Sequence, residues 1–202
     1  MVLGFASRST RDLSFNAARA TQPTATRQPP HGAIKVVQQA LLLVFPVVMA
    51  FAAANDLFTM RIPNKLSLIL IASFAAVAVV AGLTLENIAL HVAVGAAILV
   101  ITFILFSFRL LGGGDAKLMA AGALWIGVDQ MVPYLLYMTI FGGVLSLVVL
   151  AYRRMVPLTP VGFPGWAQRL HAHGTGIPYG IASAAAGLMI YPETPIFKAQ
   201  LA

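Results

Sequence analysis

Cysteine is absent from this 202-residue sequence, and charged residues are scarce. Without cysteine the chain can form no disulfide, no Cys-ligated zinc or iron–sulfur site and no thiol nucleophile. Only 9% of the residues are charged, whereas a soluble domain usually carries about 25%. So few charges cannot cover a water-facing surface, so we expect lipid to be the main solvent. The composition therefore excludes an ordinary soluble globular domain.

Apolar residues are abundant and fall into separate runs. They make up 59% of the chain, and the mean hydropathy is +0.88. A helix needs about 20 apolar residues to cross a hydrocarbon core of about 30 Å. The six predicted spans are Val36–Ala54, Leu66–Leu83, Ile88–Phe108, Leu118–Val128, Tyr134–Tyr152 and Ile177–Tyr191. The sequence thus predicts an all-α, polytopic membrane protein with about six transmembrane helices, of which the fourth and sixth are short.

Both ends of the chain differ from this apolar region. Residues 1–33 hold four arginines, one acid and many Ser, Thr and Ala residues. Such a composition cannot bury enough apolar area to order itself, so we expect a disordered basic tail, although the segment also has features of a transit peptide. Residues 34–192 form the predicted transmembrane domain, and residues 193–202 a short C-terminal tail.

The net charge of +7 does not point to nucleic acid, because the basic residues lie in alternate connections between spans. Membrane proteins keep such positive loops in the cytoplasm. Connections 1–2, 3–4 and 5–6 hold Arg61, Lys65, Arg109, Lys117, Arg153, Arg154 and Arg169. The other two connections hold no basic residue, and their only charged residues are Glu86 and Asp129. We predict that the basic connections face the cytoplasm. Six spans then place both termini outside, and the four arginines of the N-terminal tail oppose this orientation.

Two aspartates lie at span ends on the predicted cytoplasmic side. Asp56 follows the first span, and Asp115 follows the glycine run Gly112–Gly114. Ionisable groups at membrane depth are costly, which makes each a functional candidate. Each also has a structural interpretation: Asp115 could cap a helix, and Asp56 could pair with a basic residue of the same loop. The pair is more informative than either member, because no other acid lies on that side.

Two close carboxylates can hydrolyse a peptide, because they share one proton and so provide one base and one acid. A divalent metal held by the same oxygens is a weaker interpretation, since His171 and His173 follow no recognisable ligand spacing. A different class is a small ion- or proton-coupled transporter or channel subunit with the aspartates as a relay. Such relays lie near the bilayer midplane, and the second, third and fifth spans have no charge in their interiors. An assembly component without catalysis is the third alternative.

Three motifs together resemble the type IV prepilin peptidases, which are GxGD-type aspartyl proteases at the membrane boundary. The motifs are Asp56–Asn64, Gly112–Lys117 and Gly176–Ala182, and the resemblance extends from about Val36 to Tyr191. Within the family the chain most resembles the short branch of Flp/Tad pilus systems, often called CpaA- or TadV-like. The resemblance implies a multi-pass enzyme of the bacterial inner membrane. Such an enzyme cuts the basic leader from a prepilin whose apolar helix lies in the same bilayer.

The resemblance also carries residue roles to this chain by position. Asp56 and Asp115 match the two catalytic aspartates of the family. The residues expected to bind substrate or to support the site are Gly112, Gly114, Lys117, Pro178 and Tyr179. Tyr179 is either an anchor at the membrane interface or a contact of the active site. In the turn after Asp56, Asn64 is expected to cap the second span.

The chain also departs from the longer members of the family. Those members carry an extra cytoplasmic segment between the first two spans, often with paired cysteines that bind zinc, and many methylate the new N-terminus. Here only about a dozen residues join the spans and cysteine is absent. We therefore expect no metal or other cofactor, and methyl transfer is in doubt. The sequence does not define the oligomeric state.

Two further expectations concern the last cytoplasmic loop and the remaining histidines. Pro164–His171 could form a short interfacial helix with Trp166 in lipid and Arg169 at the headgroups. A plain surface loop is the alternative. His91 is expected to have no particular role.

Overall fold

The computed structural model describes residues 31–155, 162–172 and 176–201, with side chains from Val36 onward except at Gln38, Gln200 and Leu201. The chain divides into residues 1–34 and residues 35–202, and the second unit is described here by itself. The predicted N-terminal tail lies outside the described residues, apart from His31–Ala33 at the start of the first helix.

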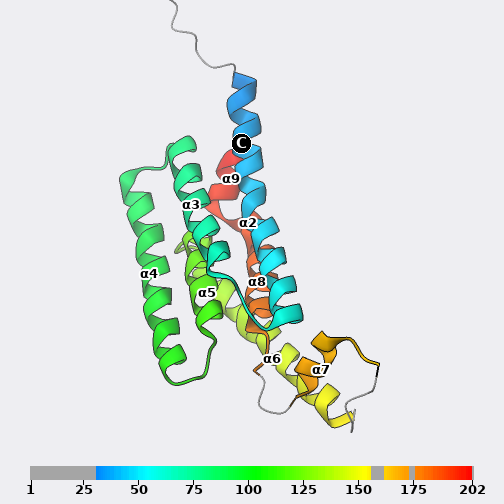
Figure 1. The fold of residues 1–202 in the computed structure, drawn as a ribbon. Helices are drawn as coiled ribbons and strands as arrows, with labels where there is room; N and C mark the ends of the chain where they lie inside the picture. Colours follow the sequence, from blue (N-terminus) through cyan, green and yellow to red (C-terminus); the bar gives the residue numbers. More distant parts are fainter. Residues whose placement is uncertain (1–30, 156–161, 173–175, 202) are drawn as a thin grey trace, which may run out of the picture. The chain divides into compact units, whose positions relative to one another are not determined.

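Six helices follow the six predicted spans in order (Figure 1). They are α2 (His31–Thr59), α3 (Asn64–Val80), α4 (Leu85–Ser107), α5 (Gly113–Ile126), α6 (Met131–Met155) and α8 (Tyr179–Ile190). Three shorter elements complete the fold: α7 (Gly165–His171), the 3₁₀ helix η1 (Tyr191–Glu193) and α9 (Pro195–Leu201). The described residues contain no strand, and the predicted all-α class is confirmed.

Among the described residues, three segments are long and apolar enough to cross a membrane by length and composition: Gln39–Thr59, Leu85–Ser107 and Met131–Met155. The chain is thus a multi-pass membrane protein. At 1.5 Å per residue, the 14 residues of α5 and the 12 of α8 are too short to cross about 30 Å of hydrocarbon. Short helices are tolerated at membrane depth where protein covers them. Most residues of both helices are buried, so the surrounding helices provide that cover.

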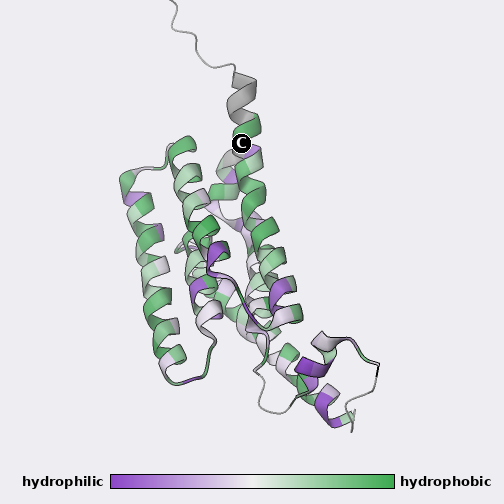
Figure 2. Cartoon of the chain, viewed as in Figure 1, coloured by the Kyte–Doolittle hydropathy of each residue, from purple (hydrophilic) through white to green (hydrophobic). Residues whose placement is uncertain are grey.

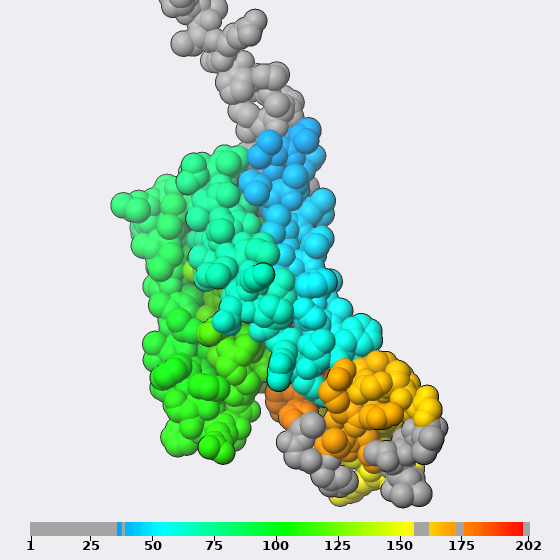
Figure 3. Space-filling view, viewed as in Figure 1, coloured from blue at the N-terminus to red at the C-terminus, as the bar shows by residue number. Residues whose placement is uncertain are grey.

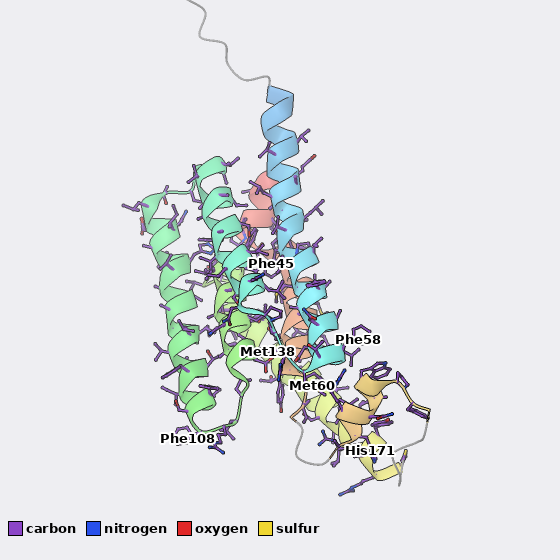
Figure 4. The ribbon with its side chains drawn as sticks, viewed as in Figure 1. Phe45, Phe58, Met60, Phe108, Met138 and His171 are labelled. Atoms are coloured by element: carbon purple, nitrogen blue, oxygen red, sulfur yellow. The ribbon has the colours of Figure 1, made fainter. Side chains whose placement is uncertain are left out.

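An aromatic cluster holds α5 and α8 inside the bundle. Phe45 of α2 lies within the bundle (Figure 4), where its ring stacks on Tyr191 at 4.6 Å and lies 5.5 Å from Trp125. The indole nitrogen of Trp125 donates to the carbonyl oxygen of Leu70 at 2.9 Å, which ties α5 to α3. The core therefore fixes the short helices whose first turns lie at the aspartate site.

The outer surface of the bundle is apolar. Large apolar side chains such as Leu68, Val100 and Leu147 are exposed on α3, α4 and α6. Figure 2 shows mostly hydrophobic residues along α3 and α4, with hydrophilic residues at the lower ends of α2 and α3 and at the upper end of α4. An apolar surface of this extent is what a lipid environment requires.

The helices alternate in direction, so the α2–α3, α4–α5 and α6–α8 connections lie at the lower end in Figure 1. The basic residues of connections 1–2, 3–4 and 5–6 therefore lie at one end of the bundle. Both Asp56, in the last turn of α2, and Asp115, in the first turn of α5, belong to the same end.

The predicted short C-terminal tail contains a helix. Residues 195–201 form α9, and its Ile196 is buried in the main core. The ring of Phe197 lies 5.1 Å from that of Tyr191, whose hydroxyl donates to the carbonyl oxygen of Leu42 at 2.9 Å. These contacts hold α9 against α2.

The connection between α6 and α8 contains the helix α7, which agrees with the helical alternative for this loop. The Arg169 guanidinium donates to the carbonyl oxygen of Phe58 at the end of α2, and its position at the lipid headgroups stays a prediction. The rings of Phe58 and Trp166 meet edge to face at 6.3 Å, and Arg153 of α6 donates to the Leu170 carbonyl at 2.8 Å. Figure 4 shows Phe58 beside α7, which therefore packs on the ends of α2 and α6.

Candidate active site

Asp56 lies in the last turn of α2, because this helix continues beyond the predicted end of the first span to Thr59. Its side chain is 5% exposed, and Oδ2 accepts a hydrogen bond of 2.8 Å from the backbone amide of Gly180. The first amides of a helix have no partner within the helix, and Pro178 at the N-cap of α8 offers no side-chain acceptor. The Asp56 carboxylate takes that place, where the helix dipole also favours a negative charge.

Asp115 is the third residue of α5, three positions after the N-cap Gly112. The Gly112 amide lies beside its carboxylate and favours the ionised form, as is usual for an acid in the first turn of a helix. Oδ1 of Asp115 is buried and has no hydrogen-bond partner among the described residues.

The two aspartates line one cleft of about 470 Å³ between the α2–α3 loop and the start of α5. Asp115 lies before the predicted fourth span, and its side chain is 9% exposed. Burial, and then the charge of Asp56, raise the pKa of Asp115 from 3.8 to about 7. The amides of Gly112 and Gly180 act in the opposite direction, so the Gly180 amide lies beside both carboxylates. The structure thus brings the two predicted residues together.

Three glycines lie close to these carboxylates and to Ile62. A Cβ at Gly112 would lie 2.7 Å from Oδ2 of Asp115, and one at Gly180 would lie 2.8 Å from Oδ2 of Asp56. A Cβ at Gly114 would lie 3.1 Å from the Cβ of Ile62. Contacts below 3.0 Å force a shift, so a side chain at Gly112 or Gly180 would displace the neighbouring carboxylate.

Ile62, in the loop between α2 and α3, contacts the first turns of both α5 and α8. Its Cδ1 would lie 2.7 Å from a Cβ at Gly180, and its backbone oxygen 3.2 Å from one at Gly114. The side chain therefore lies between the first turns of the two helices. Sequence reasoning assigned Ile62 only to the turn after Asp56.

Lys117 lies beside the aspartate cleft and binds the start of α3. Its Nζ donates to Oδ1 of Asn64 at 3.1 Å. The expectation that Asn64 caps the second span is wrong, because the N-cap of α3 is Pro63 and makes no side-chain cap. The Asn64 side chain is used instead to connect α3 with α5.

Pro178 and Tyr179 position the start of α8. Pro178 is its buried N-cap, and Tyr179 its first residue. The Tyr179 ring would lie 3.2 Å from a Cβ at Gly142, and its hydroxyl lies 3.5 Å from Oγ of Ser146. Tyr179 therefore packs α8 against α6. It also lines a cleft of about 500 Å³ beside Gly112.

The backbone amide of Gly180 is the element of the site that sequence reasoning missed. The motif Gly176–Ala182 was identified, but no role was given to this amide. One signal was present: α8 begins without Ser, Thr, Asp or Asn at its cap, so its free amides need an acceptor from elsewhere in the fold. Asp56 provides that acceptor from 124 positions away.

The histidines lie in other surroundings. The part of the chain that the structure describes holds no group of three or more His, Asp or Glu residues able to hold a metal. The ring of His171 lies 5.6 Å from that of Tyr152, and His173 is outside the described residues. His91 has a structural role, contrary to expectation, because its Nδ1 hydrogen-bonds the carbonyl oxygen of Leu124 at 2.6 Å.

The arrangement offers one carboxylate held by a helix amide and a second with an unpartnered oxygen, both in one cleft. This combination suits general acid–base chemistry on a carbonyl group.

The chain is similar to one known family of proteins. The model of the type IV leader peptidase family matches residues 43–147, just over half of the chain, and the matched region includes Asp56 and Asp115. The Gly176–Ala182 motif lies beyond it. No curated protein and no solved structure matches the chain. From the family match, this membrane protein belongs to the type IV leader peptidases.

Proposed function

We propose that this protein is an aspartic endopeptidase that removes the leader of a type IV, Flp-like prepilin on the cytoplasmic side of the bacterial inner membrane. One observation carries the proposal: Asp56 and Asp115 line the same cleft, and a buried oxygen of Asp115 has no partner among the described residues. Leaving a buried polar atom unpaired costs about 1–3 kcal/mol. A water molecule or a substrate carbonyl group would satisfy this oxygen.

The environments of the two carboxylates support different roles. The Gly180 amide donates a hydrogen bond to Asp56, while burial and the charge of Asp56 favour the protonated form of Asp115. Asp56 would take a proton from the attacking water, and Asp115 would give its proton to the carbonyl oxygen. The tetrahedral intermediate then collapses: the C–N bond breaks, the proton taken by Asp56 goes to the leaving amine, and the Asp115 carboxylate takes back a proton from one hydroxyl as the C=O bond re-forms. The two groups titrate as a pair.

The cytoplasmic orientation is supported by charge. The end of the bundle that holds the aspartates also holds the basic connections, and positive loops stay in the cytoplasm. The scissile bond of a prepilin would then lie just outside its apolar helix, at the depth of the cleft. Because these loops are basic, charge alone does not explain recognition of a basic leader.

The short connection between α2 and α3 supports the CpaA- or TadV-like branch. Only residues 60–63 separate the two helices, and the chain contains no cysteine for the zinc-binding segment of longer members. We infer peptidase activity without methyl transfer and without a cofactor.

Cleavage of a Flp-type prepilin by the purified protein in detergent tests the proposal. Asp56→Asn and Asp115→Asn should each abolish leader removal while leaving the protein inserted. Asp129→Asn is the matched control, because this exposed aspartate lies in the α5–α6 turn at the other end of α5. Undiminished cleavage by either site variant would contradict the proposal. Ion or proton uptake without any cleavage would favour the transporter.

A further inference from the structure

A second cleft, here called the α3–α4 groove, lies on the outside of the bundle beside the aspartate site. It has a volume of about 480 Å³. Its rims are the exposed side chains of Leu68 and Ile71 on α3 and of Val92 and Leu99 on α4. Its floor is formed by small buried residues of α5, Ala120 and Ala121. Figure 3 shows α3 and α4 on the same face of the molecule. The groove is therefore lined by apolar side chains, and the small residues at its floor would let another helix approach closely.

One end of the α3–α4 groove is polar. Asn64, Ser67 and Lys117 lie there, and Lys117 donates to Asn64 at 3.1 Å. The Ser67 side chain is 6% exposed, and its buried hydroxyl has no hydrogen-bond partner among the described residues. A buried hydroxyl without a partner is costly. Its position in the wall of the groove indicates an occupant with a polar group at this level.

The polar end also adjoins the aspartates. Asn64 lines both the α3–α4 groove and the cleft that contains Asp56 and Asp115. A molecule that lies along the groove with a polar end at Asn64 would present the segment beyond that end to the two carboxylates.

We propose that the α3–α4 groove binds the apolar helix of the precursor, with the start of that helix at Asn64 and Ser67. This inference rests on the proposed function, since it names where that substrate lies. The first amides of any helix lack partners within the helix, and the side-chain oxygens of Ser67 and Asn64 can accept from them. Small residues at the floor let a helix approach closely, as at other helix contacts in membranes.

A lipid acyl chain is the competing occupant of an apolar groove in a bilayer. It would fill the space between the rims equally well. It carries no hydrogen-bonding group along its length, so it would leave the Ser67 hydroxyl without a partner. The polar end beside the aspartates therefore favours the precursor helix.

Cross-linking locates the helix directly, because the natural chain has no cysteine. Single cysteines at Ala96, which lines the groove, and at its exposed neighbour Ala97, which does not, form a matched pair on α4. Each variant, combined with Asp115→Asn to prevent turnover, would carry a photoactivatable thiol probe and receive a Flp-type prepilin in liposomes. We expect cross-links to the precursor helix from Ala96→Cys and at least fivefold fewer from Ala97→Cys. Equal yields, or the reverse order, would overturn the proposal.

Steady-state kinetics provide the second measurement, in the otherwise natural protein. Ala96→Leu narrows the groove and should raise KM for the prepilin about tenfold with little change in kcat, whereas Ala97→Leu should change neither. An unchanged KM in Ala96→Leu, with cross-links only to lipid, would show that lipid occupies the groove and would overturn the inference. If the natural protein cleaves prepilin normally, that failure leaves the proposed function intact. If the natural protein does not cleave it, both proposals fall.

Discussion

At the scale of single residues, the two aspartates differ in what holds them. Asp56 accepts a hydrogen bond from the Gly180 amide, whereas Asp115 lies beside the Gly112 amide and its buried Oδ1 has no partner among the described residues. Two aspartates that served only to stabilise helix ends would not need to lie close to each other. Their common cleft is what separates a catalytic interpretation from two unrelated caps.

The raised pKa of Asp115 predicts a pH-dependent stability. Its pKa is 3.8 in the unfolded chain and about 7 in the fold, so the folded state holds the proton more tightly. The free energy of unfolding contributed by this group therefore falls as pH rises from about 4 to 7. Asp115→Asn cannot ionise, so it should be more stable than the natural protein at pH 8, by several degrees in Tm. The difference should shrink toward pH 4.

Thermal unfolding in detergent across this pH range measures the effect. Asp129→Asn, at an exposed site, controls for the loss of a negative charge. A constant difference in Tm between Asp115→Asn and the natural protein at all pH values would contradict a raised pKa.

The buried hydroxyl of Ser67 gives a second prediction at this scale. Ser67→Ala removes an unpartnered polar atom, so it should raise the free energy of unfolding of the substrate-free protein by about 1 kcal/mol. It should also raise KM for the prepilin, because one acceptor for the substrate helix is lost. A role in packing alone would change stability and leave KM the same.

Ser73→Ala on the same helix is the matched control. The Ser73 hydroxyl donates to the Ile69 carbonyl at 2.6 Å, and the residue does not line the α3–α4 groove. This variant should gain no stability and leave KM unchanged.

At the scale of elements, the start of α8 is the third component of the site, beside the end of α2 and the start of α5. Gly180→Ala places a methyl group 2.8 Å from Oδ2 of Asp56 and 2.7 Å from Cδ1 of Ile62. We expect kcat for leader removal to fall about 100-fold, the scale of losing one preorganised backbone donor at a reacting group. Initial rates at saturating prepilin measure the change.

Gly143→Ala is the control for this substitution, because a Cβ at this helical glycine meets nothing within 4 Å. It should keep the activity of the natural protein. Full activity in Gly180→Ala, with a normal Tm, would show that the amide does not position Asp56.

The elements also show how much of the fold the sequence could predict. Apolar runs predicted all six main helices, although the fourth and sixth runs are shorter than a membrane span, and two short motifs identified both aspartates. The contact of Gly180 with Asp56 joins residues 124 positions apart and uses a backbone amide, so no local pattern marks it. The α9 helix was missed because its seven residues are too few for a span, and only packing of Ile196 in the core reveals it.

At the scale of the whole molecule, the alternation of helices predicts which residues are reached from each side of the membrane. Arg154 lies in the last turn of α6, at the end that holds the aspartates, and Glu86 lies in the first turn of α4, at the other end. In spheroplasts, a membrane-impermeant thiol reagent should label Glu86→Cys and not Arg154→Cys. Inverted inner-membrane vesicles should give the opposite result. Labelling of both from one side would contradict the topology.

The central claim is that Asp56 and Asp115 act as one catalytic unit, and a double-substitution cycle tests it most directly. The initial rate of prepilin cleavage would be measured for the natural protein, Asp56→Asn, Asp115→Asn and the double variant. Groups that act as a unit lose their effect together. We predict that the double variant is no slower than either single variant. Two partial losses that multiply in the double variant would contradict the account, because the aspartates would then act independently.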